Sequence, residues 1–301
     1  PSGSPSPPPP TPPPPSALPA PPPSVSPSPP PPSDSPSPPP AFAFADKDSL
    51  QTAVDAWCTN QQSAEATYGP ISSWDVRAIT DMSSLFFTDQ SPSYDQYYDG
   101  SEVDKTACNP DINNWDMSSV TRTDSMFNGL TSFNQDISSW NMASVTRTDR
   151  MFFDARSFNQ DISSWNMASV TNADSMFLGA KSFNQDISSW DMASVTNTEA
   201  MFYEATSFNQ DISSWNMASV TDTDIMFSGA KSFNQDISSW DMTSVTTTRC
   251  ASLPAPLQPS SHPPSASASP CFRLVCACAD MFYGATSFNQ DISSWNMASV
   301  T

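Results

Sequence analysis

Tryptophan recurs at every twenty-fifth position along most of the chain, and this spacing limits the fold more than any other feature. The recurring residues are Trp115, Trp140, Trp165, Trp190, Trp215 and Trp240. A period of roughly 20–50 residues is typical of proteins in which each repeat packs only against its neighbours. Counted from each Trp, Met recurs at offset +2, Val at +5, Met and Phe at +11 and +12, and Phe and Ile at +18 and +22. The sequence therefore predicts stacked coils in which equivalent side chains form columns.

The middle of each repeat has the pattern of a short helix. Thr and an acidic residue three positions later have capping-box spacing, so that hydroxyl and carboxylate can satisfy free backbone amides. These pairs are Thr121 with Asp124, Thr146 with Asp149, Thr171 with Asp174, Thr196 with Glu199 and Thr221 with Asp224. Val, Met, Phe and Ala follow on one helical stripe. A glycine stands where the helix would end, at Gly129, Gly179, Gly229 and Gly284.

The segment "SFNQDISSW" alternates apolar and polar residues with the two-residue period of a strand. One short strand and one short helix in each repeat predict an α/β solenoid, similar to leucine-rich repeats, over residues 71–248. Residues 46–70 place Leu50, Val54, Trp57 and Cys58 on one face of an amphipathic helix that closes near Gly69. Because a solenoid exposes apolar surface at its first coil, we expect this helix to cap it.

The stretch "MFLGAKSFNQDISSWDMASVTN" resembles the mycoplasma-type surface lipoprotein repeat, which is related to the BspA-like leucine-rich-repeat surface proteins. The resemblance covers roughly residues 46 to 301. It implies a leucine-rich-repeat-like solenoid at the cell surface that acts in adhesion or recognition and has no known enzyme activity.

Residues 1–45 differ in composition from the repeats. Of the 32 prolines, 23 lie within positions 1–40, in runs such as "SPSPPPPTPPPP". Such runs favour extended polyproline II and cannot form a core, so residues 1–45 are predicted to be a disordered arm. The runs resemble extensin-type wall glycoproteins, which implies hydroxylation and O-glycosylation of the arm.

Residues 249–278 interrupt the array. When they are removed, the final partial repeat, 279–301, follows the preceding repeats in register. One interpretation is a retained intron in the gene model, because the composition differs from that of the array. A second is a genuine disordered insertion. A third is a metal or disulfide loop, since the segment contains four potential ligands, although their spacing matches no familiar zinc pattern: His262, Cys271, Cys276 and Cys278. Both chain ends also look truncated, because the sequence starts without Met and stops inside a repeat.

A second interruption, "TDQSPSYDQYYDGSEVDKTA", lies between Trp74 and Trp115 and is predicted to be a surface loop. Cys108 follows it and takes the place that Phe holds in "SFNQ". We expect Cys108 to form a disulfide with Cys58, which would join the capping helix to the first coil in an oxidising compartment.

Each "FNQDIS" segment supplies an aspartate, and stacking brings these like charges close together, at a cost in stability. One interpretation is a column of calcium sites; the other is solvated carboxylates held by serine hydroxyls and backbone amides. The latter is favoured because calcium-binding nonapeptide repeats need Gly-rich turns and this chain has only seven glycines. The column comprises Asp136, Asp161, Asp186, Asp211, Asp236 and Asp291. We therefore expect no cofactor, with calcium as the alternative.

Two offsets vary while their neighbours stay identical, which indicates side chains that point away from the core. Offset +13 holds aromatic or aliphatic residues in several repeats, and offset +16 holds basic ones. Together they form a candidate recognition strip, with neutral drift on a solvated face as the alternative: Phe153, Leu178, Tyr203, Tyr283, Arg156, Lys181 and Lys231.

The charge and composition exclude several functions. With 31 acidic and 11 basic residues the formal charge is −20, which argues against nucleic acid binding. No run of apolar residues is long enough to span a membrane, and His is absent from every repeat, so no nucleophile–base pair is evident. We expect a non-catalytic extracellular, cell-surface or cell-wall protein that binds proteins or glycans. The alternatives are a purely structural wall component and a calcium-stiffened solenoid.

Overall fold

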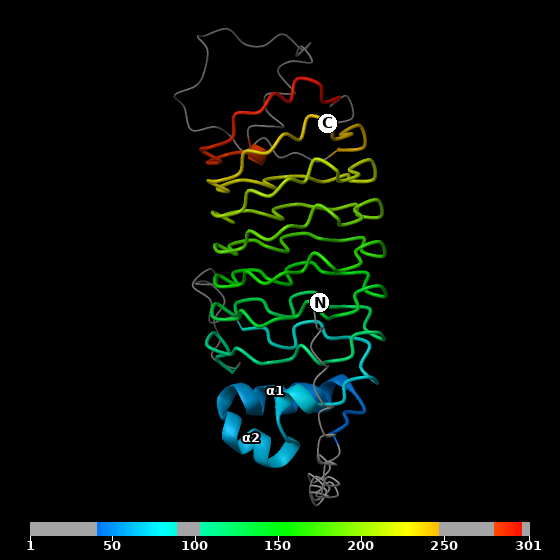
Figure 1. Ribbon diagram of the computed structural model, residues 1–301, viewed down its shortest axis with the longest axis vertical. Helices are drawn as coiled ribbons and strands as arrows, with labels where there is room; N and C mark the ends of the chain where they lie inside the picture. Colours follow the sequence, from blue (N-terminus) through cyan, green and yellow to red (C-terminus); the bar gives the residue numbers. More distant parts are fainter. Residues whose placement is uncertain (1–40, 89–102, 247–279, 297–301) are drawn as a thin grey trace, which may run out of the picture. The chain divides into compact units, whose positions relative to one another are not determined.

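The repeats stack as successive coils (Figure 1). We count each coil from one repeat tryptophan to the next. The computed structural model describes residues 41–88, 103–246 and 280–296, and the chain from Ala41 onward forms one compact unit. The predicted arm up to residue 40 and the centre of the predicted surface loop lie outside these ranges and stay predictions. At offset +7 of each coil, single parallel β-bridges join neighbouring coils. They link Asp81, Arg122, Arg147, Asn172, Asn197 and Asp222 in sequence.

Columns of aromatic rings fill the interior of the stack. Neighbouring Phe rings at offset +12 have centroids 5.5–5.7 Å apart, and neighbouring Trp rings from Trp140 to Trp295 are 6.2–6.5 Å apart. Each of these indoles donates from Nε1 to the carbonyl of Ile in the preceding coil at 3.0–3.2 Å. The tryptophans are therefore core residues, and their faces are closed to ligands.

The expectation of one helix per repeat is wrong for residues 103–246, where the segment forms consecutive turns. Residues at offset +10 have left-handed backbone, for example Ser125 with φ 57° and Ala200 with φ 53°, which ends any right-handed helix. The expected capping boxes do not form either. The Thr121 hydroxyl donates to Thr80 of the preceding coil, and Asp124 binds Arg122.

Hydrogen bonds between coils explain why turns replace the helix. In the coil that starts at Trp115, the amides at offsets +8, +10, +12 and +14 donate to carbonyls of the next coil at 2.8–3.1 Å. An α-helix would direct those amides along its own axis, four residues back. Gly129 does have a positive φ of 81°, as its position suggested, but it ends a turn rather than a helix.

The expected strand at "SFNQDISSW" also differs from the structure, since the parallel bridges form at offset +7 instead. In the "FNQ" segment, side-chain amides connect the coils. The backbone amide of Asn159 donates to the side-chain oxygen Oδ1 of Asn134 at 2.8 Å. The side-chain nitrogen Nε2 of Gln160 donates to the backbone carbonyl of Asn134 at 2.9 Å. Asparagine thus supplies the acceptor that a neighbouring backbone would supply in a sheet.

Two helices, rather than the single helix expected over 46–70, cover the first coil. Helix α1 spans Lys47–Thr59 and helix α2 spans Gln61–Tyr68, followed by the short 3-10 helix η1 at Ile71–Ser73. Asn60 divides them, because it ends α1 and its side chain accepts from the amide of Ser63 at the start of α2. The folded part also begins before residue 46, since Ala43 forms a parallel bridge with Asp75.

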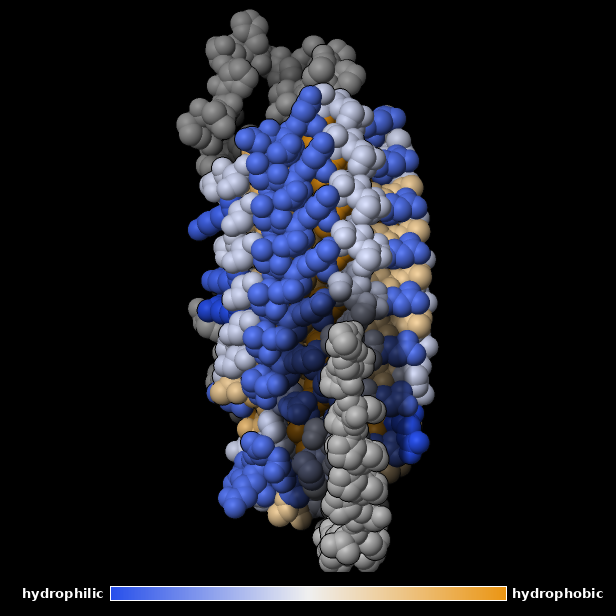
Figure 2. All heavy atoms as spheres, in the orientation of Figure 1, coloured by the Kyte–Doolittle hydropathy of each residue, from blue (hydrophilic) through white to orange (hydrophobic). Residues whose placement is uncertain are grey.

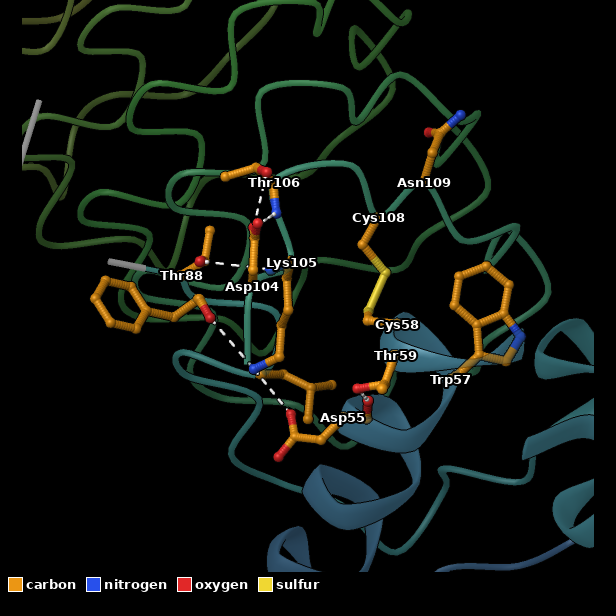
Figure 3. Close-up of a disulfide and its surroundings, with 12 residues drawn as sticks. Asp55, Trp57, Cys58, Thr59, Thr88, Asp104, Lys105, Thr106, Cys108 and Asn109 are labelled. Carbon is orange, nitrogen blue, oxygen red and sulfur yellow. Dashed lines mark hydrogen bonds and ion pairs between the residues drawn. A yellow bond between two sulfur atoms is a disulfide. The ribbon is translucent and has the colours of Figure 1, made fainter. Parts of the chain in front are cut away.

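A disulfide and a buried ion pair join α1 to the first coil (Figure 3). The disulfide links Cys58 to Cys108, the pair expected from the sequence. Lys105 is buried, and its ammonium group lies 2.8 Å from Asp55 on α1 and 3.2 Å from the carbonyl of Phe87. A buried charge needs such partners to offset its lost hydration. The helices are therefore held to the stack as a cap.

The stack continues across the interruption at residues 249–278, although residues 247–279 lie outside the described residues. The backbone amide of Gly229 donates to the carbonyl of Tyr283 at 2.7 Å, and Nε1 of Trp295 donates to the carbonyl of Ile237 at 3.0 Å. The Trp240 and Trp295 rings are 6.2 Å apart, as elsewhere in the column. The interpretations of residues 249–278 as a retained intron, an insertion or a ligand-binding loop stay predictions.

We expect deletion of residues 249–278 to leave the stack folded, because the coils on either side already pack in register. The midpoint of thermal unfolding, followed by far-UV circular dichroism, should stay within about 3 °C of that of the full chain, which for this size corresponds to roughly 1 kcal/mol. Deletion of residues 172–184 is the control, since it removes half a coil and should lower the midpoint far more. A large loss from the first deletion alone would contradict the continuity of the stack.

Candidate functional site

The candidate recognition strip follows one edge of the stack, and the backbone fixes the position of each member. The carbonyl at offset +13 accepts a hydrogen bond from the preceding coil, as when Gly179 donates to Tyr203 at 2.7 Å. Because the adjacent offset +12 rings are 5.5–5.7 Å apart, neighbouring members of the strip have a similar spacing. Hydrophilic side chains align in long columns across the coils on the face that Figure 2 shows.

Exposure varies along offset +13 more than the sequence suggested. Tyr283 is 62 % exposed, while Phe153, Leu178 and Tyr203 are half-buried. Asn128 and Ser228, which occupy the same offset, are buried. The apolar members therefore form a shallow surface in which only their outer atoms can reach a partner.

At offset +16 the three basic residues differ in availability. Lys181 and Lys231 are exposed. Arg156 is half-buried and binds the carboxylate of Asp154 through two nitrogens, at 2.7 and 3.1 Å. This pairing raises the pKa of the Arg156 guanidinium. The strip thus offers Lys181 and Lys231 as exposed cations, and Arg156 as one half of an ion pair.

The sequence pattern did not reveal the role of the column at offset +14, which lies between the apolar members of the recognition strip at offset +13 and its basic members at offset +16. Asp154 and Glu204 adopt left-handed backbone there, with φ 53° and 54°, where other coils have glycine. A Cβ at Gly179 would lie 3.1 Å from Asp154 Oδ1, and one at Gly229 would lie 3.1 Å from Glu204 Cγ. Each acid therefore occupies space left free by the glycine of the next coil. The alternation of acid and glycine in the sequence was the available signal.

The aspartate column lies on the surface, and each carboxylate accepts a backbone hydrogen bond. Oδ1 of every member accepts from the amide of the serine two residues later at 2.9–3.0 Å. This bond lowers the pKa of the carboxyl, whereas neighbouring carboxylates oppose the shift for Asp186. The repulsion expected between stacked aspartates is thus offset locally by backbone donors.

Shallow recesses separate neighbouring aspartates of this column. One has a volume of about 310 Å³ and is lined by Asp211, Ser213, Gln235, Asp236, Ser238 and Ser239. Within residues 41–88, 103–246 and 280–296, no three His, Cys, Asp or Glu side chains come together as a metal site. Calcium binding stays the less favoured alternative, which a thermal melt with and without chelator would test. His262 and the cysteines of 271–278 lie outside the described residues.

These features define a class: a repeat protein whose coils have nearly identical core columns, with residues that differ between coils at offsets that include +13 and +16. Comparison with protein families then identifies the chain. The family described as "Mycoplasma protein of unknown function, DUF285" matches residues 52–105, 96–204, 185–251 and 272–301. Since these segments cover most of the sequence, the chain belongs to this family. It is a repeat protein whose family has no assigned function.

The comparisons with curated proteins and with solved structures returned no match. None of the helices within the described residues is long and apolar enough to cross a membrane.

We predict that Arg156→Ala lowers the free energy of unfolding by about 2 kcal/mol. The substitution leaves the buried Asp154 carboxylate without its ion-pair partner, and the expected loss is below the roughly 3–5 kcal/mol seen for fully buried pairs because Arg156 is partly solvated. Denaturant unfolding measures the change. The double variant Asp154→Gly/Arg156→Lys reproduces Gly179 and Lys181 of the next coil and should regain wild-type stability; failure to do so would contradict the assigned pairing.

We predict that Asp186→Asn is nearly neutral at pH 7, because an amide oxygen can accept the same backbone bond, as Asn166 does. Asp186→Ala removes the acceptor and should cost about 0.5–1 kcal/mol.

The pH dependence distinguishes the variants further. The pKa of Asp186 is lowered in the folded state, so its contribution is complete above the unfolded value of about 4 and is lost as pH falls through the folded value. Unfolding measured from pH 7 to pH 2 should show a smaller acid-induced loss for Asp186→Asn than for the wild type. Identical pH profiles would contradict this assignment.

Proposed function

We propose that the chain is a non-catalytic extracellular or cell-surface repeat protein that recognises other proteins or glycans. The observation that carries this proposal is the variation from coil to coil at offsets +13 and +16, beside core columns that stay nearly constant. There Tyr283, Lys181 and Lys231 are exposed, and Phe153, Leu178 and Tyr203 are half-buried. A surface that varies from coil to coil beside an almost constant core suits recognition, since aromatic residues such as tyrosine are frequent at binding sites.

Two further features support an extracellular location. The Cys58–Cys108 disulfide is of a kind that persists in oxidising compartments. The proline-rich segment 1–40 resembles extensin-type wall glycoproteins, and we propose that it holds the array away from its anchoring point. We also propose that the stack is a leucine-rich-repeat-like solenoid of the BspA-like type, with no cofactor and no nucleic acid partner.

The proposal predicts saturable binding of the full chain to members of a glycan array or a panel of extracellular-matrix proteins. The variant Leu178→Ser/Tyr203→Ser should weaken that binding at least 10-fold, because it removes the apolar centre of the strip. It should fold normally, since Ser228 occupies the same offset in another coil.

The matched control is Ala168→Thr/Ala218→Thr, which alters a different surface column where Thr243 already stands. This control should bind as the wild type does. Absence of saturable binding by the wild type would instead favour a purely structural wall component. Equal weakening by both double variants would show that the strip is not the binding surface.

A further inference from the structure

A cluster of four aromatic residues closes the tryptophan column beside the cap. Phe44 packs on Trp74 with ring centroids 5.1 Å apart, and Phe42 meets Tyr68 edge to face at 5.0 Å. Phe42 is 41 % exposed, and within the described residues only Phe42 and Tyr283 are exposed large hydrophobic residues. The column of buried rings therefore ends in an exposed aromatic corner, formed by Phe42, Phe44, Tyr68 and Trp74.

The backbone holds this corner in place. Asp75 donates to the carbonyl of Phe42 at 2.8 Å, and Phe44 donates to the carbonyl of Asp75 at 3.2 Å. The indole of Trp74 donates to Gly69 at 3.1 Å. Phe42 thus remains exposed on a segment that is paired with the first coil, rather than on a loose terminus.

A groove between α1 and α2 leads to the same corner. It has a volume of about 400 Å³ and is lined mostly by small side chains, with Tyr68 at its aromatic end: Asp55, Ala56, Thr59, Asn60, Ser63, Ala64, Thr67 and Tyr68. Asp55 is the only charged residue among them, and it is paired with Lys105. The Asn60 side-chain oxygen accepts from Ser63, which leaves its amide nitrogen and the Tyr68 hydroxyl as candidate donors.

This combination matches the chemistry of a polyproline segment. Proline rings pack against aromatic side chains, and a polyproline II helix has unpaired carbonyls that accept hydrogen bonds but few amides to satisfy. A ligand segment with little charge of its own also limits the local repulsion at a chain with a formal charge of −20. Acidic ligands fit this corner poorly.

The chain itself contains such a ligand. Segment 1–40 includes 23 of the prolines and a single charged residue, Asp34. Fully extended as polyproline II, a segment of this length reaches on the order of 120 Å. Pro38, Pro39 and Pro40 immediately precede Ala41 and Phe42 in the sequence, and too few residues intervene for these prolines to turn back onto the corner. A second copy of the chain can present its prolines to the corner without that reversal.

We propose that the aromatic corner and the adjoining groove bind the proline-rich segment 1–40 of a second copy of this chain. The proposal is separate from the recognition strip, which lies on the edge of the coils.

Sedimentation velocity of the full chain over a concentration series tests the proposal. The wild type should associate with increasing concentration, and the peptide SPSPPPPTPPPP, which repeats residues 4–15, should inhibit association. A peptide with alanine at every proline should not. Phe42→Ala should weaken both association and peptide binding at least 5-fold, while Tyr283→Ala, which removes the other exposed aromatic ring, should leave both unchanged.

Tyr68→Phe is a second test in case Phe42→Ala impairs folding, because it removes only one hydroxyl. It should weaken peptide binding 2- to 3-fold and leave the midpoint of thermal unfolding unchanged. A chain that stays monomeric at all concentrations would overturn the proposal even if it binds the peptide, because the occupant would not be a second copy. Equal effects of Phe42→Ala and Tyr283→Ala would overturn the assigned site. The strip variant Leu178→Ser/Tyr203→Ser should not alter association, which separates this proposal from the proposed function.

Discussion

The register of aromatic stacking is the constraint on which the rest of the structure depends. From Trp115 onward each coil places two phenylalanines and one tryptophan on their counterparts in the next coil, and the two phenylalanines of a coil lie close together, as with Phe177 and Phe183 at 4.0 Å. Full burial of such side chains contributes roughly 1.5–3 kcal/mol each, more than a typical net hydrogen bond of about 1 kcal/mol. A coil that gained or lost one residue between these rings would move them out of alignment with their counterparts in the next coil. The long interruption before Trp295 is tolerated because it leaves the register intact.

The register also determines the backbone conformation of each coil, which explains why the local sequence pattern indicated a helix where the chain forms turns. The spacing of Thr, Asp, Met, Phe and Ala fits an amphipathic helix, and it fits equally well a series of turns that bury the same side chains. A single repeat contains nothing that distinguishes the two. The choice depends on the neighbouring coil, whose carbonyls accept the amides of Thr123, Ser125 and Phe127. Similarly, "FNQ" alternates like a strand, but the Asn134 and Asn159 side chains supply the contacts that strands would make.

Other features could be predicted from the sequence because they concern columns rather than local conformation. Cys108 stands where Phe stands in later coils, which placed it at the core beside the cap. Variation at offset +13 indicated exposure, which holds for Tyr283 and in part for Tyr203. It failed for Asn128 and Ser228, which are small enough to be covered by their neighbours. The ion pair of Arg156 was also missed, since its partner Asp154 occupies a left-handed position that the repeat pattern reserves for glycine.

Charge divides the surface into regions with different binding capacity. The aspartate column is acidic, but each carboxylate already accepts a backbone amide, as Asp161 does from Ser163 at 2.9 Å. Its charge therefore favours cations over acidic partners without requiring either for stability. Lys181 and Lys231 form a local exception, because they are exposed beside half-buried apolar residues. The corner at Phe42 is nearly neutral and aromatic. Two surfaces of different chemistry thus result from one repeat, because the core columns fix the backbone and leave outward positions free to differ, and the cap adds a third.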